Sequence, residues 1–175
     1  MTFEAVPRRR YPVRIYTSDL ILDGQLEPVG RLMDDLDDPS KTNSVLCEAQ
    51  IRPLVANSDL RPFGLQEVTT NKSDFHLVYV SDADDRDGLI LMKRTELMIA
   101  YTSRFVVRGR FHMGIETHLR YFADDLTGPF LPVSEAAIYP LFQPSTDIPR
   151  HYPLLLVNKH QIRLYHPPES AQAEE

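Results

Sequence analysis

YTSRFVVRGRFHM, residues 101–113, repeats a pattern that the chain has already used once. Residues 16–28 read YTSDLILDGQLEP. In both stretches Tyr-Thr-Ser is followed by a charged residue, three apolar residues, a charged residue, Gly, a polar residue and a large apolar residue. The offset is 85 residues, and further correspondences follow at an offset of 87, including Asn71-Lys72 with Asn158-Lys159. The chain is therefore predicted to be a tandem duplication of a module of about 75 residues.

The duplication divides the chain into five segments. The first copy is expected over residues 11–81 and the second over residues 93–168, joined by an acidic connector over residues 82–92. Residues 1–10, which contain three consecutive arginines, are expected to form a flexible basic arm. Residues 169–175 are polar and are expected to form a disordered tail.

The composition is typical of a soluble globular protein. Apolar residues make up 42% of the 175 positions and charged residues 25%. No run of 18 apolar residues occurs and the N-terminus lacks an apolar core, so neither a membrane span nor a secretory signal is expected. A single cysteine, Cys47, cannot form an intrachain disulfide, which suits a reducing cytoplasm. No cofactor is expected.

Each copy is predicted to contain about five bent antiparallel strands and one short helix. Leu20 to Leu26 has the period-two pattern of a half-buried strand, and the Gly24 inside it predicts a bulge or sharp bend. Gly30 to Asp38 predicts a short helix that Pro39 would end, and its counterpart is expected at about residues 116–124. Leu89 to Lys93 is a candidate for an extra strand. The predicted fold class is mostly β, arranged as two tandem small barrels.

The repeat unit resembles the Sm-like small barrel, the fold of the Sm, LSm and Hfq proteins. The first family motif is a strand, a charged turn and the pattern hydrophobic–x–Gly–x–hydrophobic, which Val13 to Leu26 and Met98 to Phe111 match. The second is an apolar strand, a two-residue polar turn and x-x-Ile-x-hydrophobic, which Leu154 to Pro167 follows well and Val68 to Val80 less closely. The likeness is strongest to uncharacterised bacterial domains in which a helix joins the second and third strands.

The resemblance implies both an assembly and a candidate RNA site. Sm-like barrels join edge to edge into rings, so a homo-oligomer is expected, either a dimer or a closed ring. In RNA-binding members an Asp-x-Asn element follows the second strand and Arg-Gly or Lys-His lies in the last turn. Here a helix occupies the first place, and Asn71-Lys72 and Asn158-Lys159 occupy the second. These turns could present an amide and an ammonium to RNA; alternatively, Asn serves turn geometry and Lys is a solvated tip.

The two copies carry opposite charge. Residues 11–92 hold 7 basic and 15 acidic side chains, whereas residues 93–168 hold 9 basic and 6 acidic ones. Three interpretations follow: the charged faces pair with each other within or between chains, the basic face binds an anion such as RNA, or both are solvated. The net charge of −6 disfavours a phosphate partner. The candidate basic face comprises Arg104, Arg108, Arg110 and His112, and the equivalent interface candidates in the first copy are Asp19, Asp23, Gln25 and Glu27.

No motif for catalysis or metal binding is found. The six histidines form no His-x-x-His pair, and no P-loop, Gly-x-Ser-x-Gly or Gly-x-Gly-x-x-Gly occurs. His112, Glu116 and His118 would make only a weak metal site, and the aspartates between residues 34 and 38 are expected on a solvated face. The expected function is that of a non-enzymatic binding and assembly protein that also recruits a protein partner. The alternative is an RNA-binding regulator that uses the Asn-Lys turns and the arginine face of the second copy.

Overall fold

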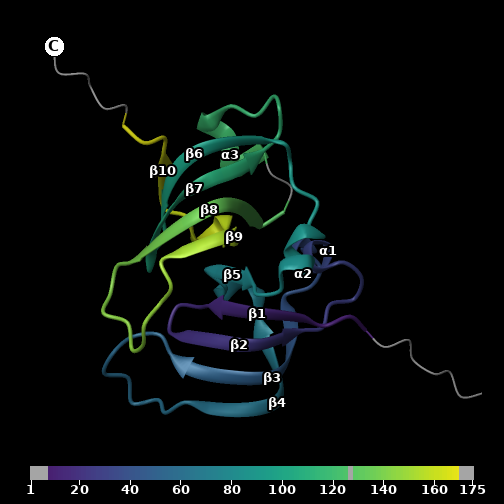
Figure 1. The fold of residues 1–175 in the computed structure, drawn as a ribbon, viewed down its shortest axis with the longest axis vertical. Coiled ribbons are helices and arrows are strands. Elements are labelled where there is room, and N and C mark those ends of the chain that lie inside the picture. The colour runs from purple at the N-terminus through teal and green to yellow at the C-terminus, as the bar shows by residue number, and fades with distance from the viewer. Residues whose placement is uncertain (1–7, 126–127, 170–175) are drawn as a thin grey trace, which may run out of the picture.

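A single antiparallel sheet of ten strands forms the body of the protein (Figure 1). The computed structural model describes residues 8–125 and 128–169. The strand order is β10-β6-β7-β8-β9-β5-β1-β2-β3-β4, so the sheet ends at β10 and β4 and is not closed into a barrel. The strands are β1 (Tyr11–Tyr16), β2 (Leu20–Leu26), β3 (Asn43–Pro53), β4 (Phe63–Asn71), β5 (Leu77–Val80), β6 (Arg94–Tyr101), β7 (Phe105–Met113), β8 (Phe130–Pro140), β9 (His151–Asn158) and β10 (Leu164–His166).

The helices in the described part of the chain are few and short. They are the α-helices α1 (Leu32–Asp37), α2 (Ala83–Asp87) and α3 (Phe122–Asp125) and the 3-10 helices η1 (Lys72–Asp74), η2 (Leu119–Tyr121) and η3 (Lys159–Gln161). The prediction of a mostly β chain is confirmed. The predicted five strands per copy are present, but they belong to one continuous open sheet and not to two closed barrels.

The two halves of the chain arrange their strands in the same order. The first half reads β5-β1-β2-β3-β4 and the second reads β10-β6-β7-β8-β9. The halves are joined where β5 pairs with β9, with Leu77 opposite Val157 and Val78 opposite Leu156. We call this junction the seam. In Figure 1 it lies between β6–β9 above and β1–β4 below. The strands at the two ends, β4 (the fourth strand of the first half) and β10 (the fifth strand of the second half), have no strand partner on their outer side among the described residues.

A glycine bends the second strand of each half. The ladder between β2 and β3 shifts register at Gly24, and the ladder between β7 and β8 shifts at Gly109. A Cβ atom at Gly24 would lie 2.8 Å from the carbonyl oxygen of Cys47, so only glycine allows this close approach. Glu48 and Glu135 adopt left-handed conformations, both with φ of 51°, on the strands facing these glycines. The predicted bend at Gly24 is confirmed.

The hydrophobic core crosses the seam. One buried cluster is built mainly from the second half but contains Tyr16 and Leu77 of the first. The other is built mainly from the first half but contains Phe130 and Leu156 of the second. The hydroxyl groups of Tyr16 and Tyr152 form a buried hydrogen bond of 2.7 Å between the halves. Each half therefore depends on the other for part of its core.

Several local predictions need correction. The second predicted helix begins later than expected, at η2. The acidic connector, for which no helix was predicted, contains α2, which Asp82 caps by accepting hydrogen bonds from two backbone N–H groups. The extra strand predicted at Leu89 to Lys93 is absent from the described residues. Arg9 and Arg10 form ion pairs with Asp85 and Glu27, so this end of the predicted arm is held. Residues 1–7 of the predicted arm and residues 170–175 of the tail lie outside the described residues.

Gly109→Ala should test whether the close strand approach requires glycine. The added Cβ would lie 3.0 Å from the carbonyl oxygen of Ser134 and 3.2 Å from the Cα atom of Ala136, both of them backbone atoms. We expect the free energy of unfolding to fall by about 2 kcal/mol in urea titrations. Gly88→Ala is the matched control, because its Cβ would be 3.4 Å from the nearest atom and its loss should stay below about 0.5 kcal/mol. Equal stability of the two variants would contradict this account.

Candidate functional site

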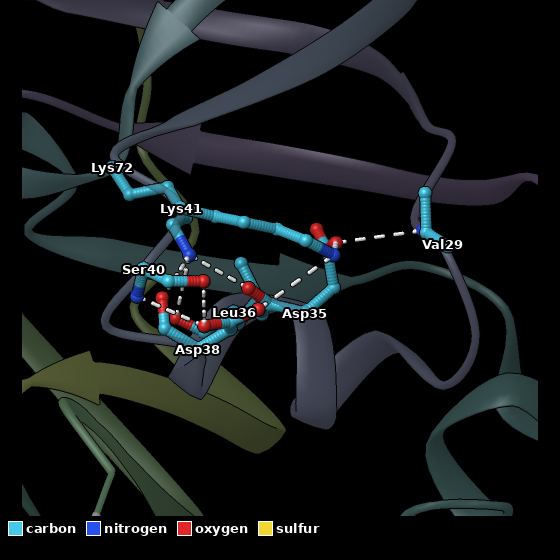
Figure 2. Close-up of polar contacts among 7 residues, drawn as sticks. All are labelled: Val29, Asp35, Leu36, Asp38, Ser40, Lys41 and Lys72. Carbon is cyan, nitrogen blue, oxygen red and sulfur yellow. Dashed lines mark hydrogen bonds and ion pairs between the residues drawn. The ribbon is translucent and has the colours of Figure 1, made fainter.

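The Lys72 ammonium group is buried at the C-terminal end of α1. Lys72 is 6% exposed, and its Nζ donates hydrogen bonds to the backbone carbonyls of Asp35 (2.6 Å), Leu36 (3.2 Å) and Asp38 (3.1 Å) (Figure 2). The last carbonyls of a helix lack partners within the helix, and a cation there also interacts favourably with the helix dipole. Lys72 is therefore an internal cap of α1, which corrects the interpretation of its side chain as a solvated tip.

The side chains around this cap organise the loop after α1. The Asp35 carboxylate accepts hydrogen bonds from Lys41 Nζ (2.7 Å) and from the backbone N–H of Val29 (3.4 Å). The Asp38 carboxylate accepts two from Ser40, one from its backbone N–H and one from its hydroxyl, and these hold the pKa of Asp38 below its usual value. Figure 2 shows the ammonium groups of Lys41 and Lys72 approaching the same short helix.

The aspartate run is more enclosed than the sequence indicated. Asp35 is buried, which corrects the expectation of a fully solvated acidic face. Burial also raises the pKa of Asp37, although its carboxylate accepts a hydrogen bond from the backbone N–H of Phe130 at 3.1 Å. Desolvation lowers the pKa of Lys72, opposed by the nearby carboxylates of Asp35 and Asp38. Across residues 8–125 and 128–169, no three His, Cys, Asp or Glu side chains are placed to hold a metal ion.

The two asparagines of the Asn-Lys turns share one local role and differ in another. The side-chain oxygen of each accepts the backbone N–H two residues on and so begins a 3-10 turn, at Asn71 and at Asn158. Asn158 is also 1% exposed and lies in the seam. Its Nδ2 donates to the carbonyl of Phe75 (2.9 Å) and its backbone N–H to the carbonyl of His76 (3.0 Å). Asn71 occupies the equivalent place at the free edge of β4 and is exposed.

The structure brings both Asn-Lys turns to one pocket of about 490 Å³ beside the seam. All four predicted turn residues line it. The Lys72 ammonium and the Asn158 amide hydrogen-bond to backbone carbonyls, as described above. The remaining polar lining comes from both halves of the chain, and the residues around the pocket include Asp37, Asp38, Lys41, Asn71, Lys72, Ser73, Phe130, Asn158, Lys159 and His160.

The predicted charged faces touch at one point. The guanidinium of Arg104 forms an ion pair of 2.9 Å with Asp19, its counterpart in the first half. The faces do not otherwise meet, because β8, β9, β5 and β1 separate β7 from β2 in the sheet. Arg108 and Arg110 point to solvent between the buried side chains of β7, as the alternation predicted. The other face residues contact their own half: Asp23 with Arg14 and Arg52, Gln25 with Glu48, Glu27 with Arg10, Arg110 with Glu135, and His112 with Met92 and Ser134.

A buried histidine at the seam was not anticipated from the sequence. His76 is fully buried, and its Nε2 lies 3.2 Å from the Ser18 hydroxyl, which donates a 2.6 Å hydrogen bond to Asp74. Its Nδ1 has no hydrogen-bond partner within the described residues. Desolvation lowers the pKa of His76, assisted by Arg104 and Arg163 and opposed by Asp74 and Asp19. The neutral ring is therefore the form that this site stabilises.

No protein family model, curated protein or solved structure matches this chain. None of the helices in the part of the chain that the structure describes is long and apolar enough to cross a membrane.

Lys72→Met should destabilise the fold, even though it replaces a buried charged group by an apolar side chain. The substitution leaves three carbonyls at the end of α1 without their donor, and we expect a loss of about 1–3 kcal/mol in the free energy of unfolding. Lys41→Met removes a lysine whose side chain is 36% exposed and whose partner, Asp35, keeps its hydrogen bond from the backbone N–H of Val29, so it should cost less, about 1 kcal/mol. Urea denaturation of both variants measures the difference. A Lys72→Met protein as stable as Lys41→Met would show that the cap contributes nothing.

Protonation of His76 should weaken the fold in mild acid. Its pKa is lower in the folded chain than in the unfolded chain, so the unfolded state binds more protons between these two values. The contribution of His76 to the free energy of unfolding is then constant above the unfolded pKa of about 6.5. It falls as the pH drops below that value, by at most about 1.4 kcal/mol per pH unit. Urea midpoints from pH 8 to pH 5 measure this loss. His76→Gln should remove that part of the slope, whereas the exposed His151→Gln should not.

Proposed function

We propose that this protein is a non-enzymatic assembly and binding protein, built from two Sm-like modules that share one sheet, and that it self-associates through the free edges β4 and β10. The observation that carries the proposal is the seam. Within one chain, the fourth strand of one half already pairs with the fifth strand of the other, and the same two kinds of strand are left open at the ends of the sheet. Strand order, the glycine bend and the 3-10 turn that an asparagine begins before the last strand of each half support the likeness to Sm-like modules.

The seam supplies a register for the proposed joint between copies. In the seam, Leu77 faces Val157 and Val78 faces Leu156. Each β5 residue corresponds to the β10 residue 87 positions later, and each β9 residue corresponds to the β4 residue 87 positions earlier. The equivalent joint would therefore place Leu164 opposite Thr70, and Tyr165 opposite Thr69, of the next copy. The Asn71 amide would then donate to the carbonyl of Ile162, as Asn158 donates to Phe75 in the seam.

The two free edges differ in character in a way that favours head-to-tail pairing. On β4 the side chains of Phe63 and Leu65 are 42% and 43% exposed, and on β10 that of Leu164 is 54% exposed. An open strand edge with exposed apolar side chains is a template for pairing with another chain. The half that ends in β4 is acidic and the half that ends in β10 is basic. Contacts between unlike edges form a closed ring when the rotation between copies closes, and a dimer is the smallest such ring.

Thr69→Pro tests the joint at the β4 edge. Lys72 donates its backbone N–H to Thr42 beside β3, and N–H directions alternate along a strand, so the N–H of Thr69 faces away from β3. Proline removes this outward donor without breaking the ladder to β3. We expect light scattering on a sizing column to show multimers for the native chain and for Thr69→Val, and a monomer for Thr69→Pro with unchanged circular dichroism.

Two results would contradict the proposal: a native chain that stays monomeric at all concentrations, or a multimer that Thr69→Pro leaves intact. Because acidic and basic edges would meet, the multimer should also weaken as the salt concentration rises. The absorbance ratio at 260 and 280 nm across the peak separates this protein assembly from one held by nucleic acid.

RNA binding is the second candidate, and one observation favours it. The Asn-Lys turns, 87 residues apart in sequence, converge on one pocket with Lys41 and His160 on its wall. Cationic and amide groups in such an arrangement can contact a phosphate and a base edge. If the native chain elutes from the sizing column with nucleic acid that high salt removes, and Lys159→Glu abolishes this nucleic acid while the multimer remains, the result would support RNA binding at this pocket.

A further inference from the structure

We propose that the β10 edge binds an extended apolar segment of a partner protein, which adds as a strand and sets large apolar side chains into the groove beside β10. The inference rests on the proposed function in one respect, that β10 is open to strand addition. It goes beyond self-association because it identifies a different occupant for this edge. The observations that support it come from comparing the two equivalent grooves of the molecule.

In the first half, the groove beside β5 is filled by side chains of the second half. Phe130, at the start of β8, lies 6.3 Å from the ring of Phe75 between ring centres and is buried. Its backbone N–H is held by Asp37 next to it. Leu156 of β9 is buried in the same cluster, which also contains Leu36 of α1. The seam thus combines strand pairing with the insertion of two large apolar side chains.

In the second half, the equivalent groove is open. It measures about 540 Å³ and is lined in part by Leu119, Ala123, Ile162, Leu164 and Tyr165. These positions correspond, at the offset of 87, to residues that are buried in the first half: Leu32, Leu36, Phe75, Leu77 and Val78.

The main chain at this edge is also available for pairing. Thr102 donates its backbone N–H to Phe105 of β7, so the preceding residue, Tyr101, faces β10, where it pairs with Leu164. The backbone N–H of the next residue, Tyr165, therefore faces away from β6. An added strand would satisfy this group and cover the exposed Leu164 side chain. The β10 edge therefore offers both features that the seam uses, outward backbone groups and an adjoining apolar groove.

A second copy of this chain fits the groove poorly. The β4 residue that would take the place of Leu156 is Thr69, and the residue in the place of Phe130 is Asn43. Setting an amide and a hydroxyl against an apolar groove costs free energy unless each finds a hydrogen-bond partner. A segment patterned like β9, HYPLLLVN, would fill the groove as the seam does.

Charge around the groove specifies the partner further. Arg120, Arg163 and His166 line it beside the apolar residues. Acidic residues flanking the apolar segment would be steered toward this rim and held in register by it. The partner chemistry is thus an extended run of large aliphatic side chains bordered by Asp or Glu. Its binding would compete with the weaker docking of a second copy, so that partner recruitment and self-association exclude each other at this edge.

Labelled peptides test the inference by fluorescence anisotropy against the full-length Thr69→Pro chain, in which the competing β4 edge is blocked. The probe is HYPLLLVN with two glutamates at each end. Its matched control replaces the leucine that corresponds to Leu156 by threonine, and a third peptide carries the β4 sequence GLQEVTTN. We expect the probe to bind at least tenfold more tightly than either of the others, a difference of about 1.4 kcal/mol.

Leu164→Asp in the protein, at an exposed position where folding should not suffer, is expected to abolish binding of the probe. Circular dichroism of this variant checks its fold. Equal affinity for the β4 peptide would identify the second copy as the occupant and overturn the inference, as would probe binding that Leu164→Asp leaves unchanged. Probe binding by a native chain that never self-associates would support the inference while contradicting the proposed function. A native chain that forms a multimer disrupted by Thr69→Pro, but that does not bind the probe, would support the proposed function and contradict the inference.

Discussion

The pairing of β5 with β9 is the interaction on which the rest of this structure depends. It is short, with two residue pairs in its ladder, but it is reinforced by the Asn158 amide on the carbonyl of Phe75 and by the buried contact between the hydroxyls of Tyr16 and Tyr152. Around it, each half contributes apolar side chains to the core of the other. A module of about 75 residues buries only a modest fraction of its surface when it folds alone. The seam gives each module part of the core that it lacks.

The two halves share one strand order but lie in different surroundings, and the residues at equivalent positions differ accordingly. The fourth strand is buried where it forms the seam, as Leu154-Leu155-Leu156-Val157, and polar where it faces water, as Glu67-Val68-Thr69-Thr70. The asparagine that begins the following turn is the same in both copies because the turn needs its side-chain oxygen in both. Only in the seam does its Nδ2 also bond across to the other half. Turn geometry explains the residue that is shared, and burial explains the residues that differ.

The sequence predicted what depends on local pattern. The alternation of β7, the bends at the strand glycines and the helix at residues 32–37 all follow from spacing that is visible in the chain. It did not predict which edges would meet, because period-two patterns identify the buried face of a strand and not its neighbours. The burial of Lys72 was missed for a related reason. Its partners are backbone carbonyls at the end of a helix more than thirty residues earlier, and no side-chain pattern marks a carbonyl as a ligand. His76 likewise looks ordinary in sequence, because its burial depends on contacts with strands from both halves of the chain.

The charge of the two halves bears on how the free edges can be used. Two β4 edges brought together would join two halves that each carry 15 acidic and 7 basic side chains, and two β10 edges would join two basic halves. Like charges at an interface disfavour both arrangements, whereas β4 against β10 places opposite charges together. The Arg104–Asp19 ion pair already joins equivalent positions of the basic and the acidic half within one chain. Exposed ion pairs add little free energy individually, so their effect is to select orientation. An edge that is polar and belongs to an acidic half, as β4 is, is thus suited to weak pairing in one direction, whereas the apolar groove at β10 is suited to a partner with large apolar side chains.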